Sequence, residues 1–482
     1  MFSTVIGSSD LTATARKTIH SILGIVVALA IVIVSVNAAA FALCPAGSKS
    51  EVVWTEYRNQ ESLDTIVLGT SLMARSLDPE VVDDHFATHS FNMSTPSQSV
   101  SESYVALREV LDNHDIKHVV YGIDFSALWP EYWGNVASVF MAEKWKGDAP
   151  WQRFEDMSYI LTDYEWMLGA TSINWAFPWV QQRVGPGEVA DNVRMKLDGT
   201  PVTKAAEYVE DGWIYHGQGY GNYNAVFDYN ADHHKSYRHL GMSPLKEENL
   251  NYLADICDLC NQRGVEFVAM VPPVPDFTLI TMKDHYAEYT RQVKELVESH
   301  GGLYLDFNLA KPDVFESRES YFQDFEHMNY EGAAVLSDAF VELVKEYEST
   351  GDVSAHFMSY DERIAGIDHI AIADLTDKVT ESGIELHASC ATGTNVIPEY
   401  QFLVDSGSGY EVVQDYSTSD SCLYVPPANG EYKVRVNIRK QGSDVEFEKH
   451  TQHSVAYAAG SPPHGKPHEN RPHGEPGQSG NR

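Results

Sequence analysis

The strongest constraint on the fold is a regular alternation of short β-branched runs with apolar-periodic segments between residues 63 and 348. The runs are expected to be strands and the longer segments helices: strands 63–69, 89–94, 117–125, 265–273 and 303–308, and helices 101–115, 243–264, 284–302 and 329–348. Strands that alternate with helices build βαβ units around a mainly parallel sheet with helices on both faces. The sequence therefore predicts an α/β domain whose sites lie at the carboxyl ends of the strands.

Local signals mark the ends of these helices. Ser101 and Ser243 are expected to be N-caps, because a serine oxygen accepts the unpaired N–H groups of a first helical turn. Gly264 is a typical helix stop. The residues just before the first strand are expected to form a short polar linker.

The alternation is interrupted at 126–242, which we interpret as a subdomain inserted into the α/β domain at 55–347. Eight of the nine tryptophans fall here, in a segment too long for a plain loop. These aromatic residues either build the insert's own small core or line a groove for a sugar or acyl group. His233, His234 and His239 suggest a metal site, but adjacent histidines point apart on a strand, and we predict no metal.

The character of the chain changes again near residue 368, where short alternating strands are separated by glycine, proline, asparagine and serine. No helix is expected there, so residues 366–456 are predicted to form a β-sandwich. Residues 400–438 resemble the immunoglobulin-like modules with recurrent tyrosines of bacterial surface proteins, which bind or space rather than catalyse. The tail at 457–482 is rich in proline, glycine and histidine and is expected to be disordered.

An uncharged apolar segment, 21–43, is long enough to cross a bilayer as a helix. Arg16 and Lys17 precede it, so the positive-inside rule predicts that residues 1–20 are cytoplasmic and that the bulk of the chain is extracellular. Alanines near the end of the segment would also suit signal peptidase. Because the apolar stretch exceeds that of a typical signal peptide, we predict an uncleaved, single-pass anchor in the cell membrane.

The net charge of the chain excludes whole classes of function. It is −35, from 34 lysines and arginines and 69 aspartates and glutamates. Binding to nucleic acid depends on neutralising phosphates, so no nucleic acid partner is expected. Broad adhesion to anionic lipid is disfavoured for the same reason.

The five cysteines carry little functional signal. Cys257 and Cys260 form a C-x-x-C in an apolar-periodic helix without a redox-type flank or a second metal-binding pair, and we interpret them as buried small residues. A redox protein built on them would need an exposed thiol of low pKa. Cys390 and Cys422 lie in the predicted sandwich and can pair outside the cell.

One predicted strand ends in a G-T-S sequence at Ser71. Ser71 is either the N-cap of the helix that follows or a nucleophile at the carboxyl end of a strand. A serine nucleophile needs a base within hydrogen-bond reach and a group that orients that base. Asp324 and His327 stand three residues apart just before the last helix of the domain, a spacing that lets both side chains project the same way.

The G-T-S at Ser71 and the D-x-x-H at Asp324 and His327 resemble the SGNH/GDSL hydrolase superfamily over residues 64–347. The segments FNMSTPSQSVSESYVALREVL, MVPPVPDF and YLDFNLAKPD are similar to its membrane-anchored extracytoplasmic branch, which includes D-alanine transfer proteins of teichoic acid synthesis and alginate-type O-acetylation proteins. The resemblance implies a three-layer α/β/α, flavodoxin-like fold without a cofactor. It assigns Ser71 as the nucleophile, His327 as the base and Asp324 as its orienter.

Two positions depart from that family's pattern. Ser94 stands where the superfamily has a glycine whose N–H enters the oxyanion hole, a change that keeps the N–H. Asp124 stands where a side-chain amide usually donates, and a carboxylate cannot donate unless it is protonated. The expected oxyanion donors are the N–H groups of Ser71 and Ser94, with Gln98 as a further candidate. Loss of one donor typically lowers kcat by about 10²–10³-fold.

Together these features predict an extracytoplasmic serine esterase or O-acyltransferase that acts on an acylated cell-envelope glycan or polymer through an acyl-enzyme. The resemblance also implies a membrane-bound O-acyltransferase as a partner. The alternative is a catalytically degenerate surface protein that binds glycan or another protein. Ser94 and Asp124 favour this alternative, whereas the set of Ser71, Asp324 and His327 opposes it.

Overall fold

The computed structural model of the chain describes residues 8–129, 137–145, 150–160, 179, 183–199, 209–210, 212–227, 244–282 and 285–458. The chain divides into two compact units, 1–59 with 135–208 and 60–134 with 209–482. The predicted domain boundaries, among them those of the insert, stay predictions. His233, His234, His239 and the tail from residue 459 lie outside the described residues.

The first unit begins with α1 (Ser8–Leu43). Within the described part of the chain, its segment Lys17–Leu43 is the one helix long and apolar enough to cross a membrane. The length and composition of this segment fit an anchor or a signal sequence. The chain just after it is held by Asn192 of α9 (Val189–Leu197), whose Oδ1 accepts the Ala46 N–H at 2.7 Å.

A helix, α2 (Lys49–Arg58), lies where the sequence suggested a polar linker, so that prediction was wrong. Ser48 caps this helix, and the ring of Trp54 lies 4.9 Å from that of Phe140 on α6 (Ala137–Lys144). The packing partner of α2 therefore comes from far along the chain, which no local sequence pattern reveals.

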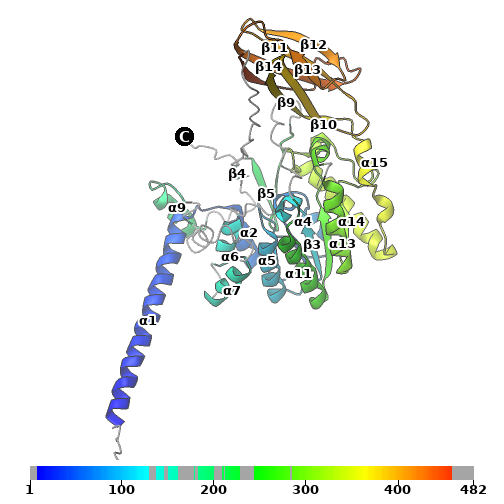
Figure 1. The fold of residues 1–482 in the computed structure, drawn as a ribbon. Helices are drawn as coiled ribbons and strands as arrows, with labels where there is room; N and C mark the ends of the chain where they lie inside the picture. The colour runs from blue at the N-terminus through cyan, green and yellow to red at the C-terminus, as the bar shows by residue number, and fades with distance from the viewer. Residues whose placement is uncertain are drawn as a thin grey trace, which may run out of the picture. The chain divides into compact units, whose positions relative to one another are not determined.

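The second unit holds a five-stranded sheet in the order β2-β1-β3-β7-β8; Figure 1 labels its strand β3. Its strands are β1 (Thr65–Leu68), β2 (Ser90–Asn92), β3 (His118–Gly122), β7 (Glu266–Val271) and β8 (Leu303–Asp306). All neighbouring pairs run parallel, which confirms the predicted α/β class. After β2 the chain crosses back over β1 to form β3, so the carboxyl ends of β1 and β3 make a topological switch point, where such sheets bind ligands.

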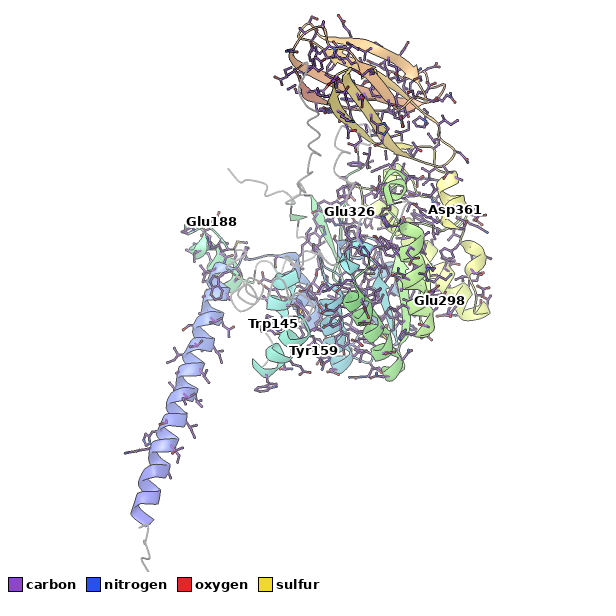
Figure 2. All side chains as sticks on the ribbon, in the orientation of Figure 1. Trp145, Tyr159, Glu188, Glu298, Glu326 and Asp361 are labelled. Carbon is purple, nitrogen blue, oxygen red and sulfur yellow. The ribbon has the colours of Figure 1, made fainter. Side chains whose placement is uncertain are left out.

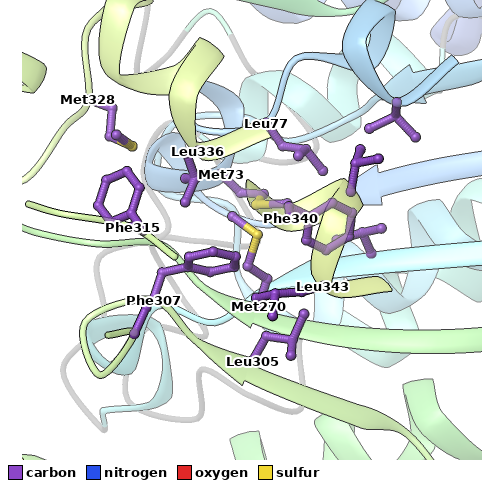
Figure 3. Packing of buried hydrophobic residues seen from close by; sticks show 14 of the residues in the cluster. Met73, Leu77, Met270, Leu305, Phe307, Phe315, Met328, Leu336, Phe340 and Leu343 are labelled. Carbon is purple, nitrogen blue, oxygen red and sulfur yellow. The ribbon is translucent and has the colours of Figure 1, made fainter. Parts of the chain in front are cut away.

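Helices cover both faces of this sheet in two groups, each of which packs together. One group is α5 (Val100–Asn113), α11 (Glu247–Arg263) and α13 (Tyr286–Ser299), and the other is α4 (Pro79–Phe86) and α14 (Tyr330–Thr350). On the second face, Val67, Met270 and Leu305 of the strands meet Leu336 and Phe340 of α14 in one buried core (Figure 3). Alternate strand residues face opposite helix layers, which gives the three-layer arrangement.

Two helices start elsewhere than predicted. The N-cap of α5 is Ser99 rather than Ser101, in a capping box where Ser99 and Glu102 bond each other's N–H groups. The S-x-x-E spacing that makes this box was present in the sequence and is the stronger signal. α11 begins at Glu247 rather than at Ser243, while its glycine stop is confirmed in the left-handed conformation at φ +69°.

A small antiparallel sheet from the predicted insert belongs to the second unit. Its strands are β4 (Val209–Glu210), β5 (Trp213–Gly217) and β6 (Tyr220–Tyr223). Trp213, Tyr215 and Tyr220 are buried, so these aromatic side chains build a core, one of the two roles that the sequence left open. The β5–β6 turn lies so close to β2 that a Cβ on Gly219, at φ +75°, would come within 1.9 Å of Asn92 O.

Two antiparallel sheets complete the second unit, in the orders β13-β10-β9 and β12-β11-β14-β15. Their strands are β9 (Ile370–Thr380), β10 (Gly383–Thr392), β11 (Pro398–Asp405), β12 (Tyr410–Ser417), β13 (Ser421–Tyr424), β14 (Gly430–Lys440) and β15 (Lys449–Tyr457). Both sheets supply one core, with Leu386 from the first and Phe402 and Val434 from the second. The predicted all-β C-terminal part is confirmed, and its likeness to immunoglobulin modules stays a prediction.

Candidate active site

Ser71 lies where β1 ends and a one-turn helix, α3 (Ser71–Ala74), begins. The N-cap of this helix is Thr70, whose hydroxyl oxygen accepts the N–H two residues on at 3.3 Å. Ser71 is therefore not the cap. Close packing fixes the turn, because a Cβ on Gly122 of β3 would lie 2.4 Å from the Met73 Cβ.

His327 and Asp324 lie in the loop that precedes α14. The Asp324 carboxylate folds this loop, since its Oδ1 accepts the backbone N–H groups of Glu326 at 3.0 Å and of His327 at 2.7 Å. A β-bridge between Phe322 and Met328 closes the loop at its base. The acid and the histidine are therefore presented from one closed turn.

The structure brings Ser71, His327 and Asp324 into one chain of hydrogen bonds. His327 Nε2 lies 2.8 Å from Ser71 Oγ, and His327 Nδ1 lies 2.9 Å from Asp324 Oδ2. A carboxylate accepts and does not donate, so the neutral imidazole carries its proton on Nδ1 and accepts the serine hydroxyl at Nε2. This is the arrangement of nucleophile, base and orienting acid in a serine hydrolase. The catalytic roles themselves stay predictions.

The charge state of Asp324 suits an orienting acid. Burial acts to raise its pKa, but the charge of His327, the hydrogen bond from that ring and the two backbone N–H bonds outweigh burial. They hold the pKa of Asp324 well below its usual range, so the group is ionised at neutral pH.

Arg75 lies beside this acid, one helical turn after Ser71. Its Nη1 is 3.8 Å from Asp324 Oδ2, and its guanidinium carbon lies 4.9 Å from the ring centroid of Tyr223. Asn222 Nδ2 donates to the Arg75 carbonyl at 2.6 Å. The β5–β6 hairpin therefore holds Arg75 against the acid.

Glu326, labelled in Figure 2, is a second carboxyl beside the histidine. Its Oε1 lies 3.8 Å from His327 Nδ1. Burial raises the pKa of Glu326 to about 7, with His327 and Arg75 lowering it and Asp124 and Asp324 raising it further. The pKa of Glu326 is thus well above that of an ordinary glutamate.

The predicted oxyanion donors Ser94 and Gln98 are engaged elsewhere. The Ser94 N–H donates to Asn92 Oδ1 at 3.0 Å. Gln98 is buried, and its Nε2 donates to Met93 O at 3.0 Å and to Thr95 Oγ1 at 3.3 Å. The loop after β2 uses these groups to satisfy its own backbone, as buried polar groups must. The expected donation by Ser94 and Gln98 therefore differs from what this structure shows.

Asp124, the third predicted residue of that set, is a pure acceptor. Its Oδ2 accepts the Thr70 hydroxyl at 2.9 Å, and its Oδ1 accepts the N–H and the hydroxyl of Ser126 at 2.9 and 2.6 Å. Because Asp124 follows β3 and Thr70 follows β1, this contact spans the switch point. Asp124 fixes the turn that carries the nucleophile and does not donate to an oxyanion.

Sequence reasoning missed Thr70, Arg75 and Glu326. Threonine, like serine, is a favoured N-cap residue, so the sequence offered two adjacent candidates for the cap and the structure uses Thr70. Glu326 stands inside the D-x-x-H spacing and could have been noticed there. Arg75 gave no signal, since Tyr223 and Asp324 are far from it in sequence.

The cysteines do not form a reactive pair in this structure. Cys257 and Cys260 lie buried in α11 as free thiols, and burial raises the pKa of each to about 12. Such thiols are inert, because the thiolate is the reactive form. Cys390 and Cys422 are also separate thiols, and Cys390 Sγ lies 3.5 Å from the Tyr400 hydroxyl.

No family model matches the sequence, and no curated protein matches it either. Among solved structures, the chain is similar to the psychrotrophic esterase EstA of Pseudoalteromonas sp., with 10% identity and a TM-score of 0.26 over 60% of this chain and 100% of that one. It is also similar to a GDSL-like lipase of Bacteroides thetaiotaomicron, with 7% identity and a TM-score of 0.27 over 61% of this chain and 98% of that one. Similarities this remote say nothing about activity, and the function rests on the residues of the site.

Proposed function

We propose that this protein is an extracytoplasmic serine esterase or O-acyltransferase that acts on acylated glycans or polymers of the cell envelope. The observation that carries the proposal is the chain of hydrogen bonds from Ser71 through His327 to Asp324, at 2.8 and 2.9 Å. At such distances a histidine can take the proton of a serine without a prior rearrangement.

The reaction starts when Ser71 Oγ attacks the ester carbonyl carbon while His327 Nε2 takes the hydroxyl proton. The ionised Asp324 stabilises the imidazolium that forms and keeps the ring oriented. His327 returns the proton to the leaving alkoxide oxygen, which leaves the acyl group on Ser71 as an ester. Water or a glycan hydroxyl then attacks this acyl-enzyme with His327 again as base, which gives hydrolysis or transfer.

The oxyanion of this reaction needs hydrogen-bond donors. The proposal relies on the Ser71 N–H, one of the first-turn donors of α3 that no helical acceptor can reach. Because the Ser94 N–H and the Gln98 amide are engaged within their own loop, we expect a slow, dedicated enzyme. Each missing donor typically lowers kcat by about 10²–10³-fold.

The same shortage of donors favours one alternative, a catalytically degenerate surface protein that binds glycan or another protein. In that case Ser71 would keep its hydrogen bond to His327 without reacting. The two functions therefore differ in one property, the nucleophilicity of Ser71.

The long apolar helix supports a site outside the cell. Arg16 and Lys17 stand at the N-terminal side of its membrane-spanning segment, Lys17–Leu43, and positive residues favour the cytoplasmic side. In this topology an uncleaved α1 tethers the second unit to the outer face of the membrane. An acyl donor then has to cross that membrane, so we propose a membrane-bound O-acyltransferase as the partner that supplies it.

Labelling with a fluorophosphonate tests the proposal. The full-length protein in detergent is treated with the probe, and mass spectrometry identifies the labelled peptide. We expect an adduct on Ser71 that is lost in Ser71→Ala and in His327→Ala, and kept in Ser349→Ala, which removes an exposed serine of α14. Absence of an adduct on the wild type, under conditions that label an established serine esterase, contradicts the enzyme and favours the binding alternative.

A further inference from the structure

A narrow pocket of about 40 Å³ lies beside the candidate nucleophile. Its described lining is mostly apolar and includes Leu72, Ile123, Phe125 and Val274, together with the two acids Asp124 and Glu326. Leu72 directly follows Ser71, and Glu326 directly precedes His327, so the segments that carry the nucleophile and the base both line this pocket. A space of this volume holds about three water-sized groups, which suits a short acyl chain.

The charged side chains that line this pocket are all acidic among the described residues. Among the described residues that line it are two carboxyls and no lysine or arginine. Asp124 is engaged by Thr70 and Ser126. The Glu326 side chain is 28% exposed, accepts no hydrogen bond from the described residues and lies 3.8 Å from the His327 ring nitrogen. Glu326 is therefore an acid that accepts no hydrogen bond from the described residues, in the wall of a mostly apolar pocket, and the proposed mechanism does not use it.

We infer that Glu326 sets the charge specificity of this pocket, excluding acyl groups that carry a carboxylate and leaving Ser71 to react with short acyl groups that carry no negative charge. The inference rests on the function proposed above, because it names the acyl groups that the same serine accepts. A carboxylate placed in the pocket meets Glu326 and Asp124 at short range, where water screens their repulsion poorly. An uncharged chain of the same length meets no such repulsion.

The exclusion is expected to increase with pH. The charged or titratable groups that act on Glu326 are His327, Asp124, Asp324 and Arg75. With a pKa of about 7, Glu326 is mostly protonated at pH 6 and mostly ionised at pH 8. Since the pKa of Asp324 is far lower, Asp324 stays ionised over this interval while the charge of Glu326 changes.

The test compares two esters of equal chain length, p-nitrophenyl butanoate and p-nitrophenyl hemisuccinate, which differ in a terminal carboxylate. For the full-length protein in detergent we expect kcat/KM to favour the butanoate by about tenfold or more at pH 8, and by less at pH 6. Glu326→Gln keeps the size of the side chain and is expected to lower the preference for the butanoate over the hemisuccinate at pH 8 by about fivefold or more. Glu331→Gln, at an exposed acid of α14, is the matched control and should keep the wild-type preference.

A preference that is equal in wild type and Glu326→Gln at both pH values overturns the inference and leaves the proposed function standing. Should the glutamine variant be unstable, Glu326→Met, which is uncharged and of similar length, has to show the same loss of preference. If the wild-type protein hydrolyses neither these esters nor p-nitrophenyl acetate, the proposed function fails, and the inference fails with it.

Discussion

The two sides of the candidate site use their polar groups in opposite ways. On the proton-transfer side, the Ser71 hydroxyl donates to His327 Nε2, and His327 Nδ1 donates to the Asp324 carboxylate. On the oxyanion side, Ser94 and Gln98 turn their donors inward to their own loop. The comparison teaches that the spacing of residues in the sequence is enough to predict a base and the acid that orients it. Whether a backbone N–H can donate to an oxyanion depends instead on whether a nearby acceptor already binds it.

Asn92 explains why the Ser94 N–H is bound within its own loop. Its Oδ1 accepts the Ser94 N–H, and its Nδ2 donates to the carbonyls of Met73 and Leu77 at 3.3 Å each. These carbonyls lie just beyond the candidate nucleophile. The loop after β2 therefore supports the turn that carries Ser71, and its donors are engaged in that support.

Removing the candidate base His327 is expected to have the largest effect, and it tests the proton-transfer side of the site. His327→Ala should lower the rate at which a fluorophosphonate phosphonylates Ser71 by about 10⁴-fold or more, because Ser71 then has no acceptor for its proton. The rate is followed by intact-protein mass. His85→Ala, at an exposed histidine of α4, is the control and should react like the wild type. A rate within about tenfold of wild type in His327→Ala would contradict the role of His327 as the base.

Neutralising the orienting acid is expected to have the next largest effect. Asp324→Asn should slow the phosphonylation of Ser71 by about 10²–10⁴-fold, since an amide favours the wrong imidazole tautomer. The folded state lowers the pKa of Asp324, so its ionised form stabilises the fold above the unfolded pKa of about 3.9, and this stabilisation is lost as pH falls through the folded pKa. Urea unfolding should therefore find Asp324→Asn less stable than wild type at pH 7, with a smaller difference near pH 3.5.

The control for this pair of measurements is Asp338→Asn, at an exposed acid of α14. Asp338→Asn should react with the fluorophosphonate at the wild-type rate at neutral pH. A stability difference between Asp324→Asn and wild type that is equal at both pH values would contradict the charge state assigned to Asp324.

A substitution at Gln98 tests the oxyanion side of the site. Its Oε1 accepts the Gly69 N–H at 3.3 Å and the Ser103 hydroxyl at 2.7 Å, both buried. Gln98→Leu removes the acceptor of the buried Gly69 N–H, whereas the Ser103 hydroxyl still has Ser99 O at 3.0 Å. The free energy of unfolding should therefore fall by about 1–3 kcal/mol in urea titrations. Gln441→Leu, at an exposed glutamine, should leave it unchanged. If Gln98→Leu keeps its stability and loses acylation by about 10²-fold, Gln98 is an oxyanion donor after all.

Ser94→Ala is expected to have the smallest effect. Among the described residues, the Ser94 hydroxyl is buried without a hydrogen-bond partner. Removing an unsatisfied buried hydroxyl should leave the free energy of unfolding unchanged or raise it by up to about 1 kcal/mol, while acylation stays within about threefold of wild type. A loss of acylation beyond about tenfold would assign this hydroxyl to the oxyanion hole.

The sheet and the proton-transfer residues could be predicted because their signals are local. Strand periodicity located β1 and β3, and the spacing of Asp324 and His327 is short enough for one turn to present both. The place of Ser71 after a strand left it open between a helix cap and a nucleophile, and the family resemblance implied the second. The positions of these residues needed only a few neighbouring residues and the rule that sites lie at strand ends.

The rest of the site depends on contacts between distant segments. Whether the Ser94 N–H is available depends on Asn92, and Asn92 depends in turn on carbonyls from the turn after β1. Likewise, Arg75 meets Tyr223 of the β5–β6 hairpin, and α2 packs on α6. Sequence patterns describe which face of an element is apolar, but they do not say which other element covers it.

The most direct test of the central claim is to capture the acyl-enzyme. The full-length protein is mixed rapidly with p-nitrophenyl acetate, and the release of p-nitrophenol is compared with the mass of the intact protein. The account predicts a burst of p-nitrophenol matched by an acetyl group on the Ser71 peptide, and neither in Ser71→Ala. Acetylation that is equally strong in Ser71→Ala, or no acetyl group on Ser71 at any time, would contradict the claim that this serine is a nucleophile.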